Sequence, residues 1–137
     1  MIMSKFEIIG KYKTGIEQID TQHQYLFDLL NRLNELIKTK GSEEELNSLI
    51  GDFLNYTEFH FKDEEKYMES EDYPKLDEHM EIHKGFVKAV TDIVEKYSGN
   101  KFLRFKFFHV VMDLLLNHIE KVDLEFADYY KQRHNIK

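Results

Sequence analysis

The stretch SEEELNSLIGDFLNYTEFHFKDEEKYM, residues 42–68, carries the pattern that decides the fold. Ser42 followed by Glu45 is the signature of a capping box and predicts that a helix begins here. Spacings of three and four residues then place on one helical face Leu46, Leu49, Ile50, Phe53, Thr57, His60, Glu64 and Met68. His60 and Glu64 lie one turn apart on this face. The face that predicts a core therefore also carries two potential metal ligands.

Three further stretches have the same helical period, and each carries a histidine on its apolar face. Helices are predicted at about 20–40, 43–69, 74–98 and 101–120, between an irregular N-terminal arm, 1–19, and a C-terminal segment to 137. Their ends follow from Asp20 and Asn100 as N-caps, Gly41 and Gly99 as stops, and Pro74 in a first turn. The inner faces of the first, third and fourth helices are predicted to hold His23, Leu26, Leu30, Leu33 and Ile37; Leu76, His79, His83, Phe86, Val90 and Val94; and Phe105, Phe108, Val111, Leu115 and His118.

Long helices joined by short breaks predict an all-α fold, an up-down-up-down four-helix bundle with an irregular N-terminal arm. A single proline and six glycines agree with few turns. Because no linker, repeat or low-complexity segment interrupts the chain, residues 1–137 are expected to form one domain without an attached output domain. Tyr129 and Tyr130 are expected to pack the C-terminal segment against the bundle, and Arg104 to reach solvent.

The composition excludes several classes of function. A net charge of −7 argues against binding to nucleic acid or to anionic membranes, which both need a cationic surface. The absence of cysteine excludes disulfides, zinc–thiolate sites and cysteine-ligated iron–sulfur clusters. No stretch has the length of apolar sequence that a membrane span needs, and the N-terminus lacks a secretory signal. The expected location is the cytoplasm.

Seven potential ligands converge from the predicted helices: His23, His60, Glu64, His79, His83, His118 and Asp123. Each cluster alone has a plain alternative, two polar residues on one helical face, so the metal interpretation rests on their conjunction. Seven ligands exceed the octahedral coordination of one ion and favour two. A carboxylate can bridge two ions through its two oxygens, so Glu64 and Asp123 are the predicted bridges and the histidines the terminal ligands. Imidazole suits iron, zinc, copper and nickel, so these residues alone leave the metal open.

His118 and Asp123 are five residues apart, a swing of roughly 140° on an ideal helix. We therefore expect the helix to end, kink or bulge between them, so that Asp123 turns inward. The remaining two histidines of the chain are not predicted to be metal ligands. His109 lies on the opposite side of its helix from His118, and His134 is in the polar tail, so both are expected to face solvent.

These motifs resemble the hemerythrin family, in particular its single-domain bacterial members. The resemblance covers nearly the whole chain and rests on GIEQIDTQH (15–23), HFKDEE (60–65), HMEIH (79–83) and HIEKVD (118–123). All seven metal-binding positions of the family hold the expected residue types. The chain departs from many members in having no tryptophan: Phe6 or Tyr12, and Leu114, occupy the corresponding regions.

The resemblance implies a non-haem centre of two iron ions with an oxo or hydroxo bridge. One iron would be held by His79, His83 and His118, the other by His23 and His60, and Glu64 and Asp123 would bridge them. The second iron would keep one position open for dioxygen. The dioxygen pocket would be lined by Leu26, Phe61, Leu115 and Ile119, for which the alternative is plain core packing.

The leading functional prediction is reversible dioxygen binding for carriage, storage or delivery, by a protein that is not an enzyme. Sensing or scavenging of dioxygen or nitric oxide through a protein partner is a second hypothesis. A di-iron peroxidase or oxidase is a third, weakened because the predicted pocket lining offers no general acid or base. A plain metal store is the fourth.

Overall fold

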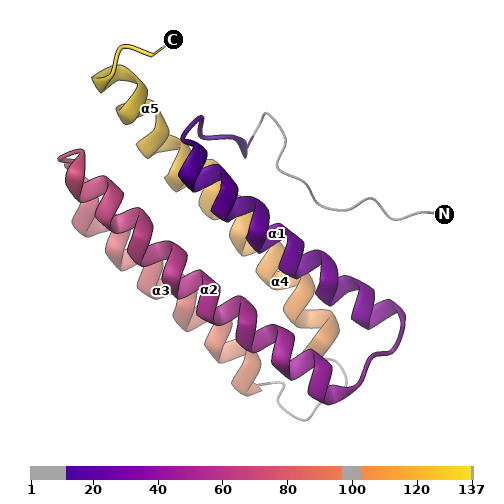
Figure 1. The fold of residues 1–137 in the computed structure, drawn as a ribbon. Helices are drawn as coiled ribbons and strands as arrows, with labels where there is room; N and C mark the ends of the chain where they lie inside the picture. The colour runs from indigo at the N-terminus through magenta and orange to yellow at the C-terminus, as the bar shows by residue number, and fades with distance from the viewer. Residues whose placement is uncertain (1–11, 97–102, 137) are drawn as a thin grey trace.

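The described chain is built almost entirely of helices that lie side by side (Figure 1). The computed structural model describes residues 12–96 and 103–136. Its elements are α1 (Glu17–Lys38), α2 (Glu43–Ser70), α3 (Leu76–Lys96), α4 (Leu103–His118), the π-helix η2 (Ile119–Asp123) and α5 (Leu124–Arg133). Each long helix packs against the next, and α4 closes back on α1. The predicted all-α four-helix bundle is confirmed.

The first helix begins earlier than predicted. α1 starts at Glu17 after Ile16, so Asp20 is not the N-cap but lies in the first turn. The Asp20 carboxylate instead accepts hydrogen bonds from the backbone N–H of Thr14 (2.8 Å) and of Gly15 (3.1 Å). Gly15 has a φ of +82°, which glycine adopts readily. The end of the N-terminal arm is thereby tied to α1.

The starts of α2 and α3 follow the sequence more closely. Ser42 Oγ accepts a hydrogen bond from Glu45 N (3.1 Å), and Glu45 Oε1 accepts one from Ser42 N (3.1 Å), which confirms the capping box. Pro74 lies in the turn just before α3, which begins at Leu76. Leu76 N donates to Tyr73 O (3.2 Å). Proline has no N–H to donate, and it thus suits a turn that enters a helix.

The end of α1 differs in one detail. The helix ends at Lys38, and Lys40, not Gly41, adopts the left-handed conformation, with a φ of 57°. Gly41 N then donates to Leu36 O (2.8 Å). Gly41 is therefore part of the helix stop, although the residue before it makes the reversal.

The fourth helix extends beyond the predicted end at residue 120. α4, η2 and α5 follow one another without a break to Arg133, so they form one continuous rod. The break expected between His118 and Asp123 is a π-turn inside this rod, which changes the helical phase without ending the helix. Gly99, Asn100 and Phe6 lie outside the described residues, and so does the side chain of Arg104.

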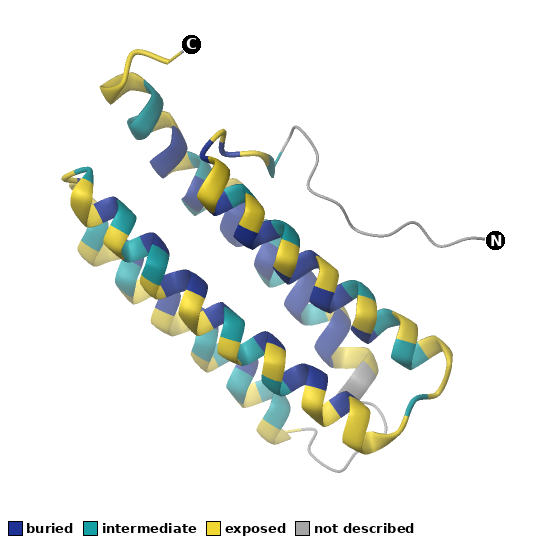
Figure 2. Cartoon of the chain, viewed as in Figure 1, coloured by how far each residue is buried: buried dark blue, intermediate teal, exposed yellow. Residues whose placement is uncertain are grey.

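Buried residues line the inner faces of the helices and exposed residues the outer faces (Figure 2). Every residue of the face predicted for α2 is buried. The face predicted for α4 is correct for Phe108, Val111, Leu115 and His118. It is wrong for Phe105, which is 56% exposed and packs its ring against His109 on the outer surface. Phe107 is fully buried instead.

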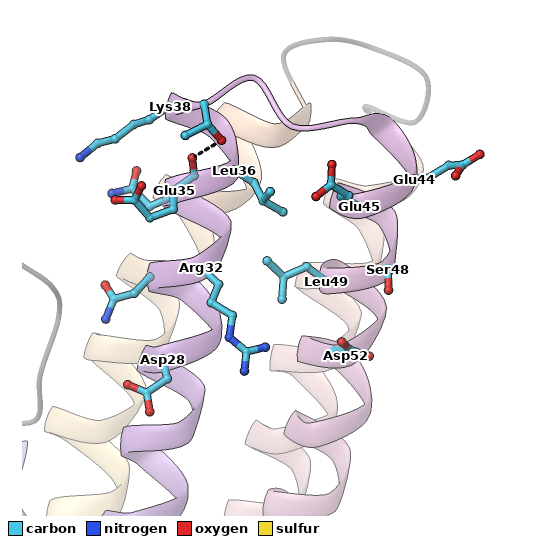
Figure 3. A pocket seen from close by; sticks show the side chains of 13 residues that line it. Asp28, Arg32, Glu35, Leu36, Lys38, Glu44, Glu45, Ser48, Leu49 and Asp52 are labelled. Atoms are coloured by element: carbon cyan, nitrogen blue, oxygen red, sulfur yellow. Dashed lines mark hydrogen bonds between the residues drawn. The ribbon is translucent and has the colours of Figure 1, made fainter.

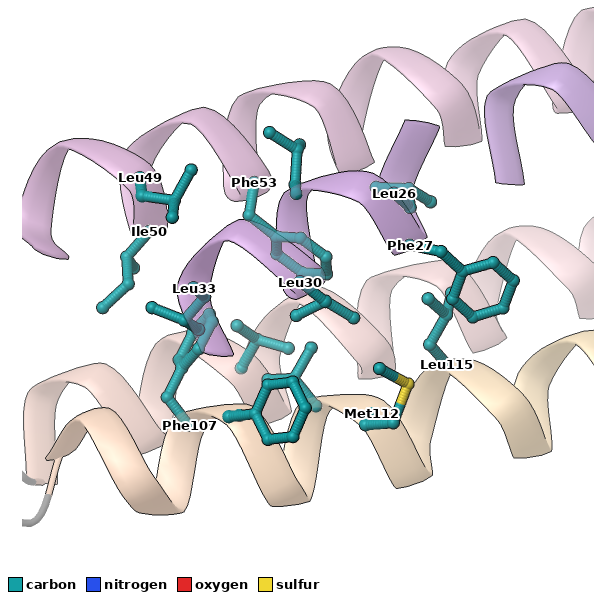
Figure 4. Packing of buried hydrophobic residues seen from close by; sticks show 14 of the residues in the cluster. Leu26, Phe27, Leu30, Leu33, Leu49, Ile50, Phe53, Phe107, Met112 and Leu115 are labelled. Atoms are coloured by element: carbon teal, nitrogen blue, oxygen red, sulfur yellow. The ribbon is translucent and has the colours of Figure 1, made fainter. Parts of the chain in front are cut away.

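Two apolar clusters fill the interior. The main cluster consists mostly of leucine, isoleucine and phenylalanine side chains from the four long helices, α1 to α4. Among them are Leu33, Phe53 and Phe107 (Figure 4). The satellite cluster, at the end of the bundle near α5, consists of Ile16, Ile19, Met68, Tyr73 and Phe126. None of the described helices is both long and apolar enough to cross a membrane.

The C-terminal helix packs on the satellite cluster as expected. Tyr129 and Tyr130 are half-buried against it. The Tyr129 hydroxyl donates to Glu71 O (2.8 Å), and Arg133 Nη1 donates to the same carbonyl (2.6 Å). These bonds hold α5 against the connection between α2 and α3.

Candidate metal centre

Seven ionisable side chains meet between the two apolar clusters, and they are those singled out in the sequence. Each is at most 6% exposed: His23, His60, Glu64, His79, His83, His118 and Asp123. Their ligand atoms form two groups, each with all its atoms within 4.8 Å of one another. The first group is Glu64, His79, His83, His118 and Asp123; the second is His23, His60, Glu64 and Asp123. Only the two carboxylates belong to both groups.

The π-helix η2 brings Asp123 to the site. Leu124 N donates to Ile119 O, five residues back, which is the hydrogen bond of a π-turn. One residue is thus added to the turn, and residues five apart come to the same side of the rod. Asp123 Oδ1 lies 3.2 Å from His118 Nε2 as a result. The expected bulge between these two residues is present.

The Glu64 carboxylate faces both groups, one oxygen to each. Oε1 lies 2.9 Å from His79 Nε2 and 3.0 Å from His83 Nε2. Oε2 lies 3.5 Å from His60 Nε2 on the opposite side. This is the arrangement that a carboxylate bridging two cations requires.

Asp123 repeats the same division. Its Oδ1 lies near His118 Nε2 and 3.3 Å from His79 Nε2, in the first group. Its Oδ2 lies 3.0 Å from His23 Nε2, in the second group. Both carboxylates therefore divide their oxygens between the two groups.

Among the described residues, the buried side-chain atoms without a hydrogen-bond partner all belong to this site. They are His23 Nδ1 and Nε2, His60 Nε2, Glu64 Oε2, His118 Nε2, and Asp123 Oδ1 and Oδ2. A buried polar atom without a partner is costly. Carboxylate oxygens and unprotonated imidazole nitrogens are all acceptors, so they cannot satisfy one another. A cation between them satisfies both, and the donor set therefore fits metal ions.

The carboxylates and histidines shift one another's pKa values strongly. Burial raises the pKa of Glu64, and so does Asp123, but His60 and the bonds to His79 and His83 outweigh them and hold it at about 2. Burial lowers the pKa of His79, but the bonds to Asp123 and Glu64 prevail and raise it to about 9. Burial dominates at His60 and lowers its pKa to about 4. The site thus holds two anionic carboxylates and attracts positive charge.

A chain of hydrogen bonds behind His60 fixes its protonation. Gln22 Nε2 donates to Asp63 Oδ2 (2.7 Å), so the Gln22 oxygen is turned toward His60. His60 Nδ1 lies 2.5 Å from that oxygen and must donate to it. The Nε2 atom of His60 is then the one with a free lone pair, and it faces the site. Gln18 Nε2 also donates to Asp63 Oδ2.

His83 is oriented by a charged partner instead. Its Nδ1 lies 2.6 Å from Glu65 Oε2, which can only accept. Partners of this kind orient a metal-binding histidine and set which nitrogen faces the metal. Gln22, Asp63 and Glu65 were not singled out in the sequence. Gln22 and Asp63 meet from α1 and α2, and no local spacing signals a contact between two helices.

The four predicted pocket residues, Leu26, Phe61, Leu115 and Ile119, lie in the main cluster, each at most 4% exposed. The Phe61 ring stacks on His83, with 3.8 Å between ring centroids and an angle of 7°. Its centroid also lies 5.7 Å from that of His60 and 5.4 Å from that of His118. Phe61 therefore closes the apolar side of the candidate site.

Other polar features lie apart from this centre. His109 and His134 are exposed, as expected. An open groove of about 990 Å³ lies between α1 and α2 near their connection (Figure 3). In this view Arg32 extends into the groove below Leu36 and Leu49. The residues that line this groove include none of the seven potential ligands.

Comparison with known proteins gives a consistent result. Residues 14–130 match the model of the Hemerythrin HHE cation binding domain. The chain is 31% identical to a bacteriohemerythrin of Clostridium acetobutylicum over 124 residues, which cover 86% of this chain and 95% of the relative. It is 30% identical to a bacteriohemerythrin of Methylococcus capsulatus, over 83% of this chain and 87% of the relative. A bacteriohemerythrin of Stenotrophomonas maltophilia is 29% identical, over 88% and 78% respectively. The chain therefore belongs to the hemerythrin family.

Proposed function

We propose that this protein binds dioxygen reversibly at a centre of two iron ions, for carriage, storage or delivery. The observation that carries the proposal is the division of each carboxylate between two groups of histidines. The two oxygens of Glu64 face His79 and His60 in opposite groups, an arrangement that suits one ion in each group. Membership of a family of non-haem iron proteins that bind dioxygen supports iron as the metal.

The proposed ligands differ in number between the two ions. His79, His83 and His118 would hold one ion, and His23 and His60 the other, with Glu64 and Asp123 bridging. The ion on the side of His23 and His60 would have one protein ligand fewer. An exogenous small molecule would therefore bind on that side.

The two ferrous ions would supply the two electrons that bound dioxygen accepts and would regain them on its release. The protein's part is to keep that exchange reversible by excluding water. The proposed pocket residues Leu26, Phe61, Leu115 and Ile119 are buried and apolar, and none can exchange a proton. The absence of an acid or base among these four supports binding over catalysis.

The hydrogen bonds behind the histidines would hold the ligand set in place. Gln22 would keep the Nε2 lone pair of His60 directed at one ion, and Glu65 would do the same for His83. The neutral amide and the charged carboxylate are different partners. A carboxylate makes its imidazole the stronger electron donor, so the two ions would experience different ligand fields.

The test is the visible absorption of the reduced, iron-loaded protein as air is admitted and then removed, with iron counted per chain. Two irons per chain and a charge-transfer band that fades on deoxygenation are expected. Prompt and irreversible conversion to a ferric spectrum would overturn reversible binding and favour a redox enzyme or an iron store. The same titration with nitric oxide tests the alternative of a nitric oxide sensor or scavenger.

A further inference from the structure

A buried tyrosine lies beside the metal centre, in the satellite cluster. Tyr73 is 6% exposed, and its ring centroid lies 6.5 Å from that of His79 in an edge-on contact. The ring centroid of the half-buried Tyr129 lies 5.1 Å from that of Tyr73. Tyr73 therefore links a proposed iron ligand to an aromatic side chain that reaches the surface.

The Tyr73 hydroxyl has a built-in proton acceptor. It donates to Glu125 Oε1 (3.2 Å), and Lys75 Nζ lies 3.0 Å from the same oxygen. A phenol that gives up an electron also loses its proton, and Glu125, which accepts the hydrogen bond of the Tyr73 hydroxyl, is placed to take it.

The same place is open to small molecules. A surface hollow of about 120 Å³ is lined by Tyr73, Lys75, Glu78, His79, Ile82, Lys121, Val122 and Glu125. A small reductant in this hollow would lie against Tyr73. The hollow thus gives the buried phenol a second connection to solvent, besides Tyr129.

We propose that Tyr73 is a protective one-electron donor, which supplies the second electron when hydrogen peroxide reacts at a half-reduced iron centre. This inference rests on the proposed di-iron centre. Reduction of one peroxide to two waters consumes two electrons and two protons. One electron would come from the iron that the seven candidate ligands would hold. Tyr73 supplies the other, its hydroxyl proton passes to Glu125, and the two protons for water come from solvent.

The neutral tyrosyl radical formed in this way must be reduced again. A one-electron reductant such as a thiolate or ascorbate in the hollow would return the electron, and Glu125 would return the proton. A reductant at the surface could also return the electron through the ring of Tyr129. The oxidising equivalent would then leave the interior without attacking the apolar side chains around the ligands.

The test is freeze-quench electron paramagnetic resonance of the half-reduced, iron-loaded protein mixed with one equivalent of hydrogen peroxide. A tyrosyl signal is expected in the wild type and in Tyr67→Phe, and its loss is expected in Tyr73→Phe. Tyr67 is the matched control because it packs in the same region against Phe126 and Tyr130. Glu125→Gln, which removes the proton acceptor, should slow radical formation by about ten-fold.

The outcomes separate this inference from the proposed function. Wild type that holds two irons and binds dioxygen reversibly, with an unchanged radical in Tyr73→Phe, would overturn the role of Tyr73 alone. A chain that holds no iron would overturn both proposals. A radical in the zinc-loaded protein under the same peroxide would also contradict the inference, because zinc cannot supply the first electron. Circular dichroism and the iron content of Tyr73→Phe verify that the variant is folded and loaded.

Discussion

The bundle interior has two parts that are equally buried and chemically opposite. In the main cluster, the apolar side chains of Leu33, Phe53 and Phe107 are at most 2% exposed. At the candidate metal centre, Glu64 and Asp123 are as deeply buried, at 1%. Burying each large apolar side chain stabilises the fold by about 1.5–3 kcal/mol. Burying a charge opposes folding unless it is compensated.

Residues of the same helix therefore serve two different roles, stabilising the fold and providing candidate metal ligands. The main cluster and the satellite cluster stabilise the fold. They keep the seven candidate ligands buried, although burial of their charged groups opposes folding. On α2 the order is Phe61, Glu64, Met68, so the charged ligand is placed between a residue of each cluster. A change in one part should therefore alter stability, and a change in the other should alter metal binding.

The largest effect is expected from removing a ligand. His118→Ala should lose the di-iron centre or leave it incomplete, because its Nε2 faces Asp123 Oδ1 in the group of three histidines. His109→Ala is the control on the same helix and should keep its iron, since His109 is exposed. The measurement is the number of iron ions per chain in the two variants after identical loading. Equal iron in both variants would contradict the ligand assignment.

In the apolar part, Phe107→Ala should lower the free energy of unfolding by about 3–5 kcal/mol, the usual cost of deleting a buried aromatic ring. Phe105→Ala should change it by less than about 0.5 kcal/mol, because that ring is 56% exposed. Urea unfolding of both variants measures the difference. The folded Phe107→Ala protein should still bind its metal. Loss of metal at full helicity would show that the two parts are not separable.

The match between sequence and structure follows from what a local pattern contains. The position of His60 and Glu64 on one face depends only on helical spacing, and the structure has both inside. The same reasoning predicts a bulge between His118 and Asp123, since two inward residues five apart cannot share a face of a regular helix. The prediction of an end at residue 120 failed, because a π-turn meets the same demand while the helix continues.

Beyond the convergence of the seven potential ligands, contacts between helices are what the sequence did not predict. Which of Phe105 and Phe107 faces inward depends on the rotation of α4 against its neighbours, and both positions are phenylalanine. The bond between Gln22 and His60 joins α1 to α2, thirty-eight positions apart in the chain. Tyr73 lies in the connection before α3 and contacts His79 six positions later. Spacing within a helix carries none of this information.

Protons should compete with metal ions for the histidines of the candidate metal centre. Without metal, Asp123 and Glu64 hold the pKa of His79 at about 9 against the effect of burial, so this imidazole is protonated at pH 7. Metal binding must displace that proton. The apparent affinity should therefore rise by about ten-fold for each pH unit between 7 and 9 and level off above. Titration with zinc, which is redox-silent, measures this dependence. A flat profile over that range would contradict the role of the two carboxylates.

The smallest effect expected is on the rate of autoxidation. Leu115→Ala should speed conversion of the iron-loaded protein to its ferric form in air by several-fold, because the truncated side chain admits water beside His118. Such a change corresponds to less than about 1.4 kcal/mol in the barrier. Leu33→Ala is the matched control. Leu33 belongs to the same main cluster and is about as deeply buried, at 2% against 1%, but it is not one of the four proposed pocket residues. Both variants should lose stability, and only Leu115→Ala should oxidise faster. Equal rates in the two variants would assign Leu115 to packing alone, and the dioxygen pocket would then have to be sought among the other residues around His23 and His60.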